Sequence, residues 1–450
     1  MAQALYSVPA PASLKQAMLP GEVTLNAEES ASAQQLRRNF LWFAFTFSVN
    51  HGVVTSPLVI PTSLLPPDVG YLGNALLNVF TVLSTFSLGA PAVSILGLRG
   101  SILFGMFFYC VYATLFAASV AVSSEAENLQ RLLFCAGSAC GGIAAGVLWT
   151  AQGGYFARTV DLLARKEDIE RSTLTSTLAS TFAVFYLVCE VATKLLWALL
   201  AELHVAEWII AAIFAAVGVL ALLLMTQTMK FSSAGPQVNC TVKARAALSL
   251  WQDPVLILVS GLNLSFGFSA AFMGGFVTGT FAKPQLGESA VPMLAAFSAT
   301  FAAMFARCFG TLEVSIGKGP LVVLGSVSFL LIPLSFFVLG CCSGWDWWLL
   351  VLYVFQGIGR AVYESTSKGI FADLFPGQPV GAFSNAMLQT SLAFALCFLL
   401  SDILTGPVIA GVSMLLSVLT PIGYFAALWL RRRAKARAEE GANDDLGLKC

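Results

Sequence analysis

The stretch MKFSSAGPQVNCTVKAR, residues 229–245, is the longest polar interruption within the apolar part of the chain. Its Gly-Pro pair and its Ser, Asn and Thr residues are typical of a loop, and three Lys or Arg residues add positive charge. Apolar sequence of similar length lies on either side of it. We therefore predict two halves, residues 37–228 and 254–430, joined by a central loop at 229–253.

The composition indicates that this chain is a membrane protein. Of the 450 residues, 57% are hydrophobic and only 11% are charged, whereas about a quarter of the residues in soluble proteins are charged. The mean hydropathy is +0.81. Apolar stretches recur along nearly the whole length, so a single membrane anchor is excluded and the lipid bilayer is the predicted surrounding.

Six apolar stretches in each half reach or approach the roughly 20 residues that a helix needs to cross a bilayer. The predicted fold is therefore an all-α polytopic membrane protein with twelve transmembrane helices in two groups of six. The predicted spans are residues 39–60, 71–93, 100–121, 131–153, 174–199, 207–227, 254–277, 290–309, 320–340, 346–367, 381–401 and 407–430.

Lys and Arg are distributed unevenly between the predicted loops. With a cytoplasmic N-terminus, the outer loops hold only Arg131 and Lys283, and the cytoplasmic segments hold most of the others. Positive loops resist translocation, so both termini are predicted to be cytoplasmic. Residues 1–36 and 431–450 are then a disordered N-terminal tail and a basic C-terminal tail. The plasma membrane and internal membranes both remain open.

The two halves resemble each other in sequence. The loop after the second span reads AVSILGLRG (92–100), and the loop after the eighth reads EVSIGKGP (313–320). The fourth span ends in VLWTAQGGYFAR (147–158), and the tenth in AVYESTSKGIFAD (361–373). Both pairs are offset by about one half of the chain, which is typical of a duplicated six-helix unit.

This layout resembles the major facilitator superfamily. In that superfamily the loop after the second span carries the signature Gly-x-x-x-Asp-Arg-x-Gly-Arg, but here Val93 and Ser94 replace the acid and the base. The stretches GGIAAGVLWTAQGGYFAR (141–158) and GIGRAVYESTSKGIFADLFP (357–376) resemble the UNC-93-like branch. The resemblance implies solute or ion transport by alternating access, or the regulation and trafficking of other membrane proteins, including ion channels.

Two charges lie within the apolar fifth span, in LVCEVATKLLW (187–197). A lone charge at the bilayer centre costs roughly 2.5–3.5 kcal/mol on insertion scales. Glu190 and Lys194 are four residues apart, so they share one helix face within reach of an ion pair. Two interpretations are open: a self-neutralising structural pair, or a Glu190 that titrates and couples proton or cation movement to a conformational change.

The tenth span repeats this arrangement. Arg360 and Glu364 are four residues apart, and Lys368 follows after another four. Because these charges lie toward the cytoplasmic end, where the two halves must open and close, we favour a structural inner-gate network over a transport site. Gln356, one turn deeper, is expected to face a cavity.

Other polar residues of the candidate pathway lie in the first, fourth and seventh spans. Asn50 and His51 lie near the middle of the first, and histidine titrates close to physiological pH, although a hydrogen-bonded packing role is the alternative. Trp149 and Gln152 lie in the fourth span and Asn263 in the seventh. These spans line the central cavity in the fold that the sequence resembles, which implies that these side chains face the pathway.

Closely spaced glycines in the fourth span predict close helix contact. The run GSACGGIAAG (137–146) contains a Gly-x-x-x-Gly pattern at Gly142 and Gly146. Small residues let two helices approach each other closely. We expect this pair to pack against another helix of the same bundle, not to form a dimer interface.

The sequence does not favour catalysis, and no cofactor or metal is expected. There are only two histidines, His51 and His204, and the ten cysteines have no C-x-x-C spacing. No nucleic-acid partner is indicated. The predicted function is therefore transport of a small solute or ion, and it is coupled to protons or cations in the interpretation in which Glu190 titrates. The alternative function is that of a non-transporting escort with a membrane-protein partner.

Overall fold

The computed structural model describes residues 30–59, 61–231, 249–287, 290–338, 344–401 and 404–447, and within these ranges the chain forms helices and no strand. The elements are α2 (Ala33–Val59), α3 (Pro61–Leu64), α4 (Pro67–Ser84), η1 (Thr85–Gly89), α5 (Ala90–Ala121), η2 (Ser124–Ala126), α6 (Glu127–Glu167), α7 (Arg171–Glu202), α8 (Glu207–Met225), η3 (Leu250–Gln252), α10 (Pro254–Ala271), η4 (Phe272–Ala282), α11 (Lys283–Leu286), α12 (Ala290–Ile316), α13 (Lys318–Val338), η5 (Asp346–Leu349), α14 (Leu350–Val362), η6 (Tyr363–Ser367), α15 (Lys368–Leu374), α16 (Pro379–Ser401) and α17 (Gly406–Gly447).

The described part of the chain contains nine helices that are long and apolar enough to cross a membrane. Three predicted spans, 39–60, 71–93 and 346–367, are not among them. The second of these contains a shorter apolar helix, Leu72–Ser84. The third is divided between η5, α14 and the π-helical turn η6.

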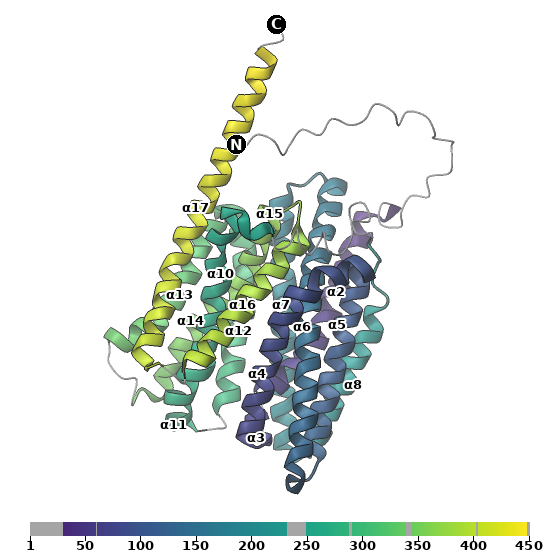
Figure 1. Cartoon of the computed structure of the whole chain (residues 1–450), viewed down its shortest axis with the longest axis vertical. Helices are drawn as coiled ribbons and strands as arrows, with labels where there is room; N and C mark the ends of the chain where they lie inside the picture. The colour runs from purple at the N-terminus through teal and green to yellow at the C-terminus, as the bar shows by residue number, and fades with distance from the viewer. Residues whose placement is uncertain are drawn as a thin grey trace.

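The helices pack in two groups, which Figure 1 shows side by side. In the first group, α2 packs against α7 and α8, α4 against α6, and α5 against α6 and α8. In the second group, α10 packs against α16 and α17, α12 against α14, and α13 against α14 and α17. The first group comprises α2–α8 and the second α10–α17. They meet where α7 packs on α12 and where α16 packs on α4 and α6.

Several helices extend beyond the predicted boundaries. α2 begins at Ala33 because Ser32 and Gln35 cap it reciprocally: Ser32 N–H donates to Gln35 Oε1 at 2.8 Å, and Gln35 N–H donates to Ser32 Oγ at 3.2 Å. The predicted tail at 1–36 therefore ends in a helix; residues 1–29 lie outside the described part. Most of the predicted central loop, residues 232–248, also lies outside it.

At the C-terminal end, α17 continues through the predicted basic tail to Gly447. The sequence RRRAKARAEE is rich in Ala, Arg and Glu, which are strong helix formers even where no packing supports them. α6 likewise runs through much of the charged stretch 157–172 and ends where Asp168 adopts a left-handed conformation, with φ of 54°. Charged residues here extend helices past the apolar region; they do not terminate them.

The glycine pair of the fourth predicted span makes a close helix contact within the bundle, as expected. A Cβ atom on Gly142 would lie 2.4 Å from the carbonyl oxygen of Leu77, and one on Gly146 would lie 2.4 Å from Thr85 N. Ser84 Oγ donates to the Gly142 carbonyl oxygen at 3.0 Å. Only glycine lets α4 and η1 approach α6 this closely.

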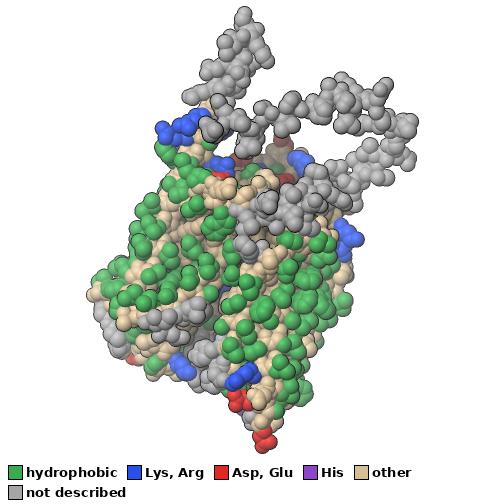
Figure 2. Space-filling view, viewed as in Figure 1, with side chains coloured by type: hydrophobic (Ala, Val, Ile, Leu, Met, Phe, Trp, Pro, Cys, Tyr) green, Lys and Arg blue, Asp and Glu red, His purple; other side chains and the backbone are tan. Residues whose placement is uncertain are grey.

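The outer surface suits a lipid environment. Hydrophobic side chains cover much of the flank seen in Figure 2, and many large ones are exposed, for example Leu83, Leu220, Ile257 and Leu415. In that view Lys, Arg, Asp and Glu gather at the two ends of the bundle. Water does not solvate apolar side chains on this scale, whereas a bilayer does.

Candidate functional site

An ion cluster lies where α7 of the first group meets α14 of the second. Glu190 accepts a hydrogen bond from Lys194 Nζ at 2.5 Å. It also accepts from Arg360 Nη1 at 3.1 Å, and Arg360 Nη2 completes a bidentate contact. The i,i+4 pair expected from the sequence is present, but the carboxylate also joins the two groups of helices. Such paired geometry lowers the cost of burying each charge.

A second ion pair extends this cluster one turn further along the tenth predicted span. Lys368 Nζ donates to Glu364 at 2.6 Å. The same ammonium lies 4.7 Å from the ring centroid of Trp149 and 5.3 Å from that of Phe182, both in the first group. Glu364 lies in the π-helical turn η6 (Tyr363–Ser367). Such turns are frequent at functional sites because they shift side chains out of the regular helical positions.

The five charged side chains of this central cluster do not balance. The cluster is Glu190, Lys194, Arg360, Glu364 and Lys368, with side-chain exposures between 4% and 17%. Three cations face two carboxylates, so one positive charge is in excess. A buried excess charge is unfavourable in a low-dielectric setting.

His51 lies beside the cluster. Its Nε2 is 2.9 Å from the hydroxyl oxygen of Tyr186, and its ring centroid is 5.2 Å from that of Trp149. Its Nδ1 is buried and has no hydrogen-bond partner among the described residues. Arg360 lies 5.9 Å from the ring of Tyr186. Tyr186 therefore connects His51 to the ion cluster.

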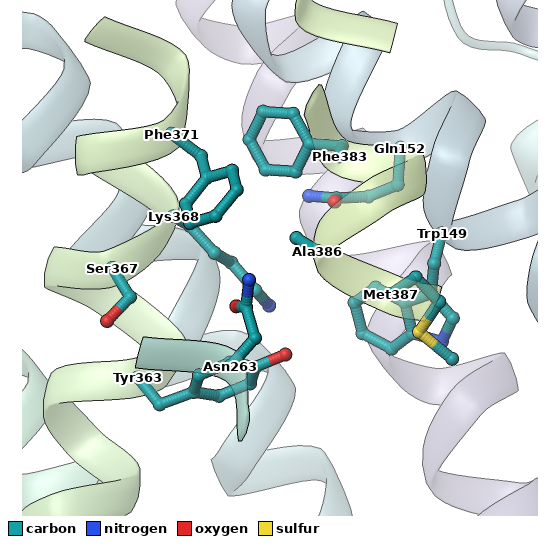
Figure 3. A pocket seen from close by; sticks show the side chains of 10 residues that line it. All are labelled: Trp149, Gln152, Asn263, Tyr363, Ser367, Lys368, Phe371, Phe383, Ala386 and Met387. Atoms are coloured by element: carbon teal, nitrogen blue, oxygen red, sulfur yellow. The ribbon is translucent and has the colours of Figure 1, made fainter. Parts of the chain in front are cut away.

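A small cavity opens next to Lys368, as Figure 3 shows. Its volume is about 30 Å³, enough for about two water molecules. The lining residues come from α6, α10, η6, α15 and α16: Trp149, Gln152, Asn263, Tyr363, Ser367, Lys368, Phe371, Phe383, Ala386 and Met387. The cavity is thus formed by both groups of helices, and of the lining residues that the structure describes, Lys368 is the charged one.

Not every residue predicted for the pathway lies in this site. Asn50 is buried inside the first group, where its amide donates to Gly218 O at 3.1 Å and contacts Cys110 Sγ at 3.5 Å. Gln356 is buried and accepts a hydrogen bond from Ser269 at 3.0 Å. Both make packing contacts within one group. Asn263 lines the cavity and donates to Gln389 at 2.7 Å.

The remaining predicted residues gather around the cluster and the cavity: His51, Trp149, Gln152, Glu190, Lys194, Asn263, Arg360 and Glu364. The sequence analysis assigned Lys368 only to the inner-gate network, from its four-residue spacing after Glu364, and it did not include Tyr186 and Ser367. Tyr186 and Ser367 carried no such signal, because only the packing of α7 and the π-turn brings them to the site.

A second network joins the two groups at the end of the bundle where α7 begins and α12 ends, which is the predicted cytoplasmic end. Arg171 donates to Asp373 at 2.9 Å, and Thr175 donates to the same oxygen at 3.0 Å. Lys318 also pairs with Asp373. Nearby, Glu313 accepts from Ser176 and, at 2.7 Å, from Thr366. These contacts connect the two groups of helices at this end.

No group of three or more His, Cys, Asp or Glu side chains that could hold a metal ion occurs within the described part of the chain. The site combines two ammonium groups, a guanidinium, two carboxylates and a histidine near a small cavity. Such a set can bind a charged or polar solute and exchange ion-pair partners.

No family model matches the chain. Solved structures do. The proton:xylose symporter XylE of the major facilitator superfamily, bound to 6-bromo-6-deoxy-D-glucose, is 14% identical over 88% of this chain and 94% of its own, with a TM-score of 0.60. A bacterial homologue of the iron transporter ferroportin, in an outward-facing state, is 13% identical over 87% of this chain and 99% of its own, with a TM-score of 0.62. The same homologue with soaked iron gives a TM-score of 0.64 at 14% identity.

At such low identity this similarity establishes the fold and not the substrate. The chain has the fold of the major facilitator transporters. With its apolar, membrane-length helices it is an integral multi-pass membrane protein.

Proposed function

We propose that this protein transports a small solute by alternating access. It has twelve spans in two repeats, residues 37–228 and 254–430, and both termini are cytoplasmic. The observation that carries the proposal is the central cluster, in which Glu190 of the first group is held by Arg360 of the second beside a cavity lined by both. Alternating access requires a site shared by two bodies that rock against each other.

Two further observations support this mechanism. The pairing order of helices in the first group matches that in the second, as expected for two related bundles. The network around Asp373 connects the two groups near the predicted cytoplasmic end, and the cavity is a separate feature next to Lys368. A gate separated from a central site is the arrangement that rocking requires, because only one end opens at a time.

We further propose that transport is coupled to a proton or cation through the central cluster and His51. The test is ion flux in proteoliposomes with an internal pH indicator, under imposed proton and potassium gradients. Wild type is expected to exceed empty liposomes, and the double variant Glu190→Gln/Arg360→Gln, which keeps the net charge of the cluster, is expected to lose at least tenfold of the flux. A wild-type rate equal to that of empty liposomes contradicts coupling.

The network around Asp373 gives a second prediction. Asp373→Asn removes the acceptor shared by Arg171, Thr175 and Lys318, so the predicted cytoplasmic end should open more often. A partly buried pair of this kind contributes on the order of 1–2 kcal/mol, or about tenfold in the open population. The rate at which a polar thiol reagent labels a cysteine placed at Ala386, which lines the cavity, measures this population.

The matched control for that prediction is Glu167→Gln. Glu167 pairs with Arg37 at 2.5 Å near the same end of the bundle, but both residues belong to the first group. Breaking this pair leaves the contact between the groups intact. Equal labelling rates in the two variants would show that the Asp373 network is no gate.

The second candidate function is that of a non-transporting escort or regulator of other membrane proteins, as the sequence resemblance to the UNC-93-like branch implies. The replacement of the signature acid and base by Val93 and Ser94 favours it. An escort does not require a polar cavity between its two halves, and its partner-binding surface lies outside that cavity. Loss of partner binding by surface variants, with wild-type binding retained in Glu190→Gln/Arg360→Gln, would support the escort.

A further inference from the structure

We propose that the cavity beside Lys368 binds a small organic anion, a carboxylate with an apolar body. This inference rests on the proposed transport function for its purpose, but the binding site itself does not. Among the described residues that line the cavity, Lys368 alone is charged and none is a carboxylate. The charge that the cavity presents to a ligand is therefore positive.

The surrounding charges indicate the same sign. The central cluster holds three cations and two carboxylates, with one positive charge in excess. A monovalent anion next to Lys368 would bring this buried cluster to neutrality, whereas a cation would raise the excess to two. The low-dielectric surroundings make that difference large.

Neutral donors in the cavity fit a carboxylate. The Gln152 side chain is buried, with 2% exposure of the residue, and its carboxamide lines the cavity. Figure 3 shows Gln152 and Lys368 reaching toward the cavity from opposite sides. Ser367 lies on the lining as well. One carboxylate oxygen can accept from Lys368 and the other from the Gln152 amide, an arrangement of charge-assisted hydrogen bonds.

The rest of the lining selects an organic body. Trp149, Phe371, Phe383, Ala386 and Met387 form the apolar walls. The cavity of about 30 Å³ accommodates a head group of two oxygens. A larger body requires the walls to move, and Met387 is a side chain that adapts easily. Lys368 donates one hydrogen bond to Glu364 at 2.6 Å, and because an ammonium has three donors it can bind an incoming anion while it keeps this pair.

The test is calorimetric titration of the full chain in nanodiscs with benzoate and with benzamide, which has the same shape but no charge. Benzoate is expected to bind at least tenfold more tightly than benzamide. Lys368→Met should remove this preference, and Lys368→Arg should restore it. Arg37→Met is the control: that guanidinium pairs with Glu167 within the first group and is not part of the cavity lining.

A second variant tests the proposal in case Lys368→Met fails to fold. Gln152→Glu adds a negative charge to the lining at nearly constant volume and should abolish benzoate binding. Equal binding of benzoate and benzamide would overturn the proposal, and so would competition by chloride as strong as that by benzoate. Benzoate that binds but is not transported leaves the anion site standing while the transport function fails. Ion flux without benzoate binding would support the transport function and refute the anion site.

Discussion

Glu190→Gln is expected to destabilise the protein by about 3–5 kcal/mol, because the change leaves Lys194 and Arg360 buried without their shared carboxylate. The excess of positive charge in the central cluster then rises from one to two. Thermal unfolding of the purified protein in nanodiscs, followed by tryptophan fluorescence, measures the effect. The double variant Glu190→Gln/Arg360→Gln returns the excess to one and should recover most of the lost stability.

The matched control for this prediction is Glu127→Gln. Glu127 and Arg131 have the same four-residue spacing as Glu190 and Lys194, with N–O contact at 2.9 Å, but both are exposed. An exposed pair contributes about 0–1 kcal/mol. Similar losses in Glu190→Gln and Glu127→Gln would mean that the central cluster is solvated and that its ion pairs are not the connection between the groups.

The second large effect is expected at Gly146. A Cβ atom there would lie 2.1 Å from Ser84 Oγ and 2.4 Å from the backbone nitrogen of Thr85, so no side-chain rotation relieves the clash. Gly146→Ala should destabilise the protein by about 1–3 kcal/mol, and Gly146→Leu by more, because α4 and η1 must move away from α6. The midpoint of thermal unfolding and the yield of monodisperse protein report the change.

Gly411 of α17 is the control for this substitution, because a Cβ atom added there meets no atom within 4 Å. Gly411→Ala should be neutral or slightly stabilising, since alanine favours helix more than glycine does. Should Gly146→Ala prove as well tolerated as Gly411→Ala, the close approach of α4 to α6 would be wrong.

The sequence predicted correctly the features that depend on the spacing of residues within one helix. Composition and apolar runs indicated a polytopic helical protein, and the fold of the structural neighbours agrees with that class. The spacing of Glu190 and Lys194 predicted a contact that the structure contains. Gly142 and Gly146 predicted close packing, which is also present. Each of these follows from the geometry of a single helix.

Contacts between segments that are far apart in the sequence could not be predicted from spacing. Arg360 lies 170 residues from Glu190, and no spacing rule connects the two. Asn50 looked like a pathway residue, but it satisfies the carbonyl of Gly218, because polar side chains within a membrane also serve to hold helices together. The reciprocal cap of Ser32 and Gln35, by contrast, is a local sequence signal. It places the start of α2 at Ala33, before the predicted start at residue 39.

The missing acid and base of the loop signature illustrate the same limit. Val93 and Ser94 suggested that the ionic contact between the two halves was lost. The structure instead has an ionic contact at the same end, formed by Arg171 with Asp373. These two residues lie in different halves, and no motif of the sequence indicated that they form a pair.

The most direct test of alternating access is the two-sided accessibility of Ala386, which lines the cavity between the two groups. In a chain whose ten native cysteines have been replaced, a cysteine at this position is labelled with a membrane-impermeant thiol reagent, in vesicles of either orientation. The account predicts labelling from both faces, with Asp373→Asn raising the rate from the predicted cytoplasmic face and lowering it from the other. Labelling from one face only, unchanged by Asp373→Asn, would contradict alternating access.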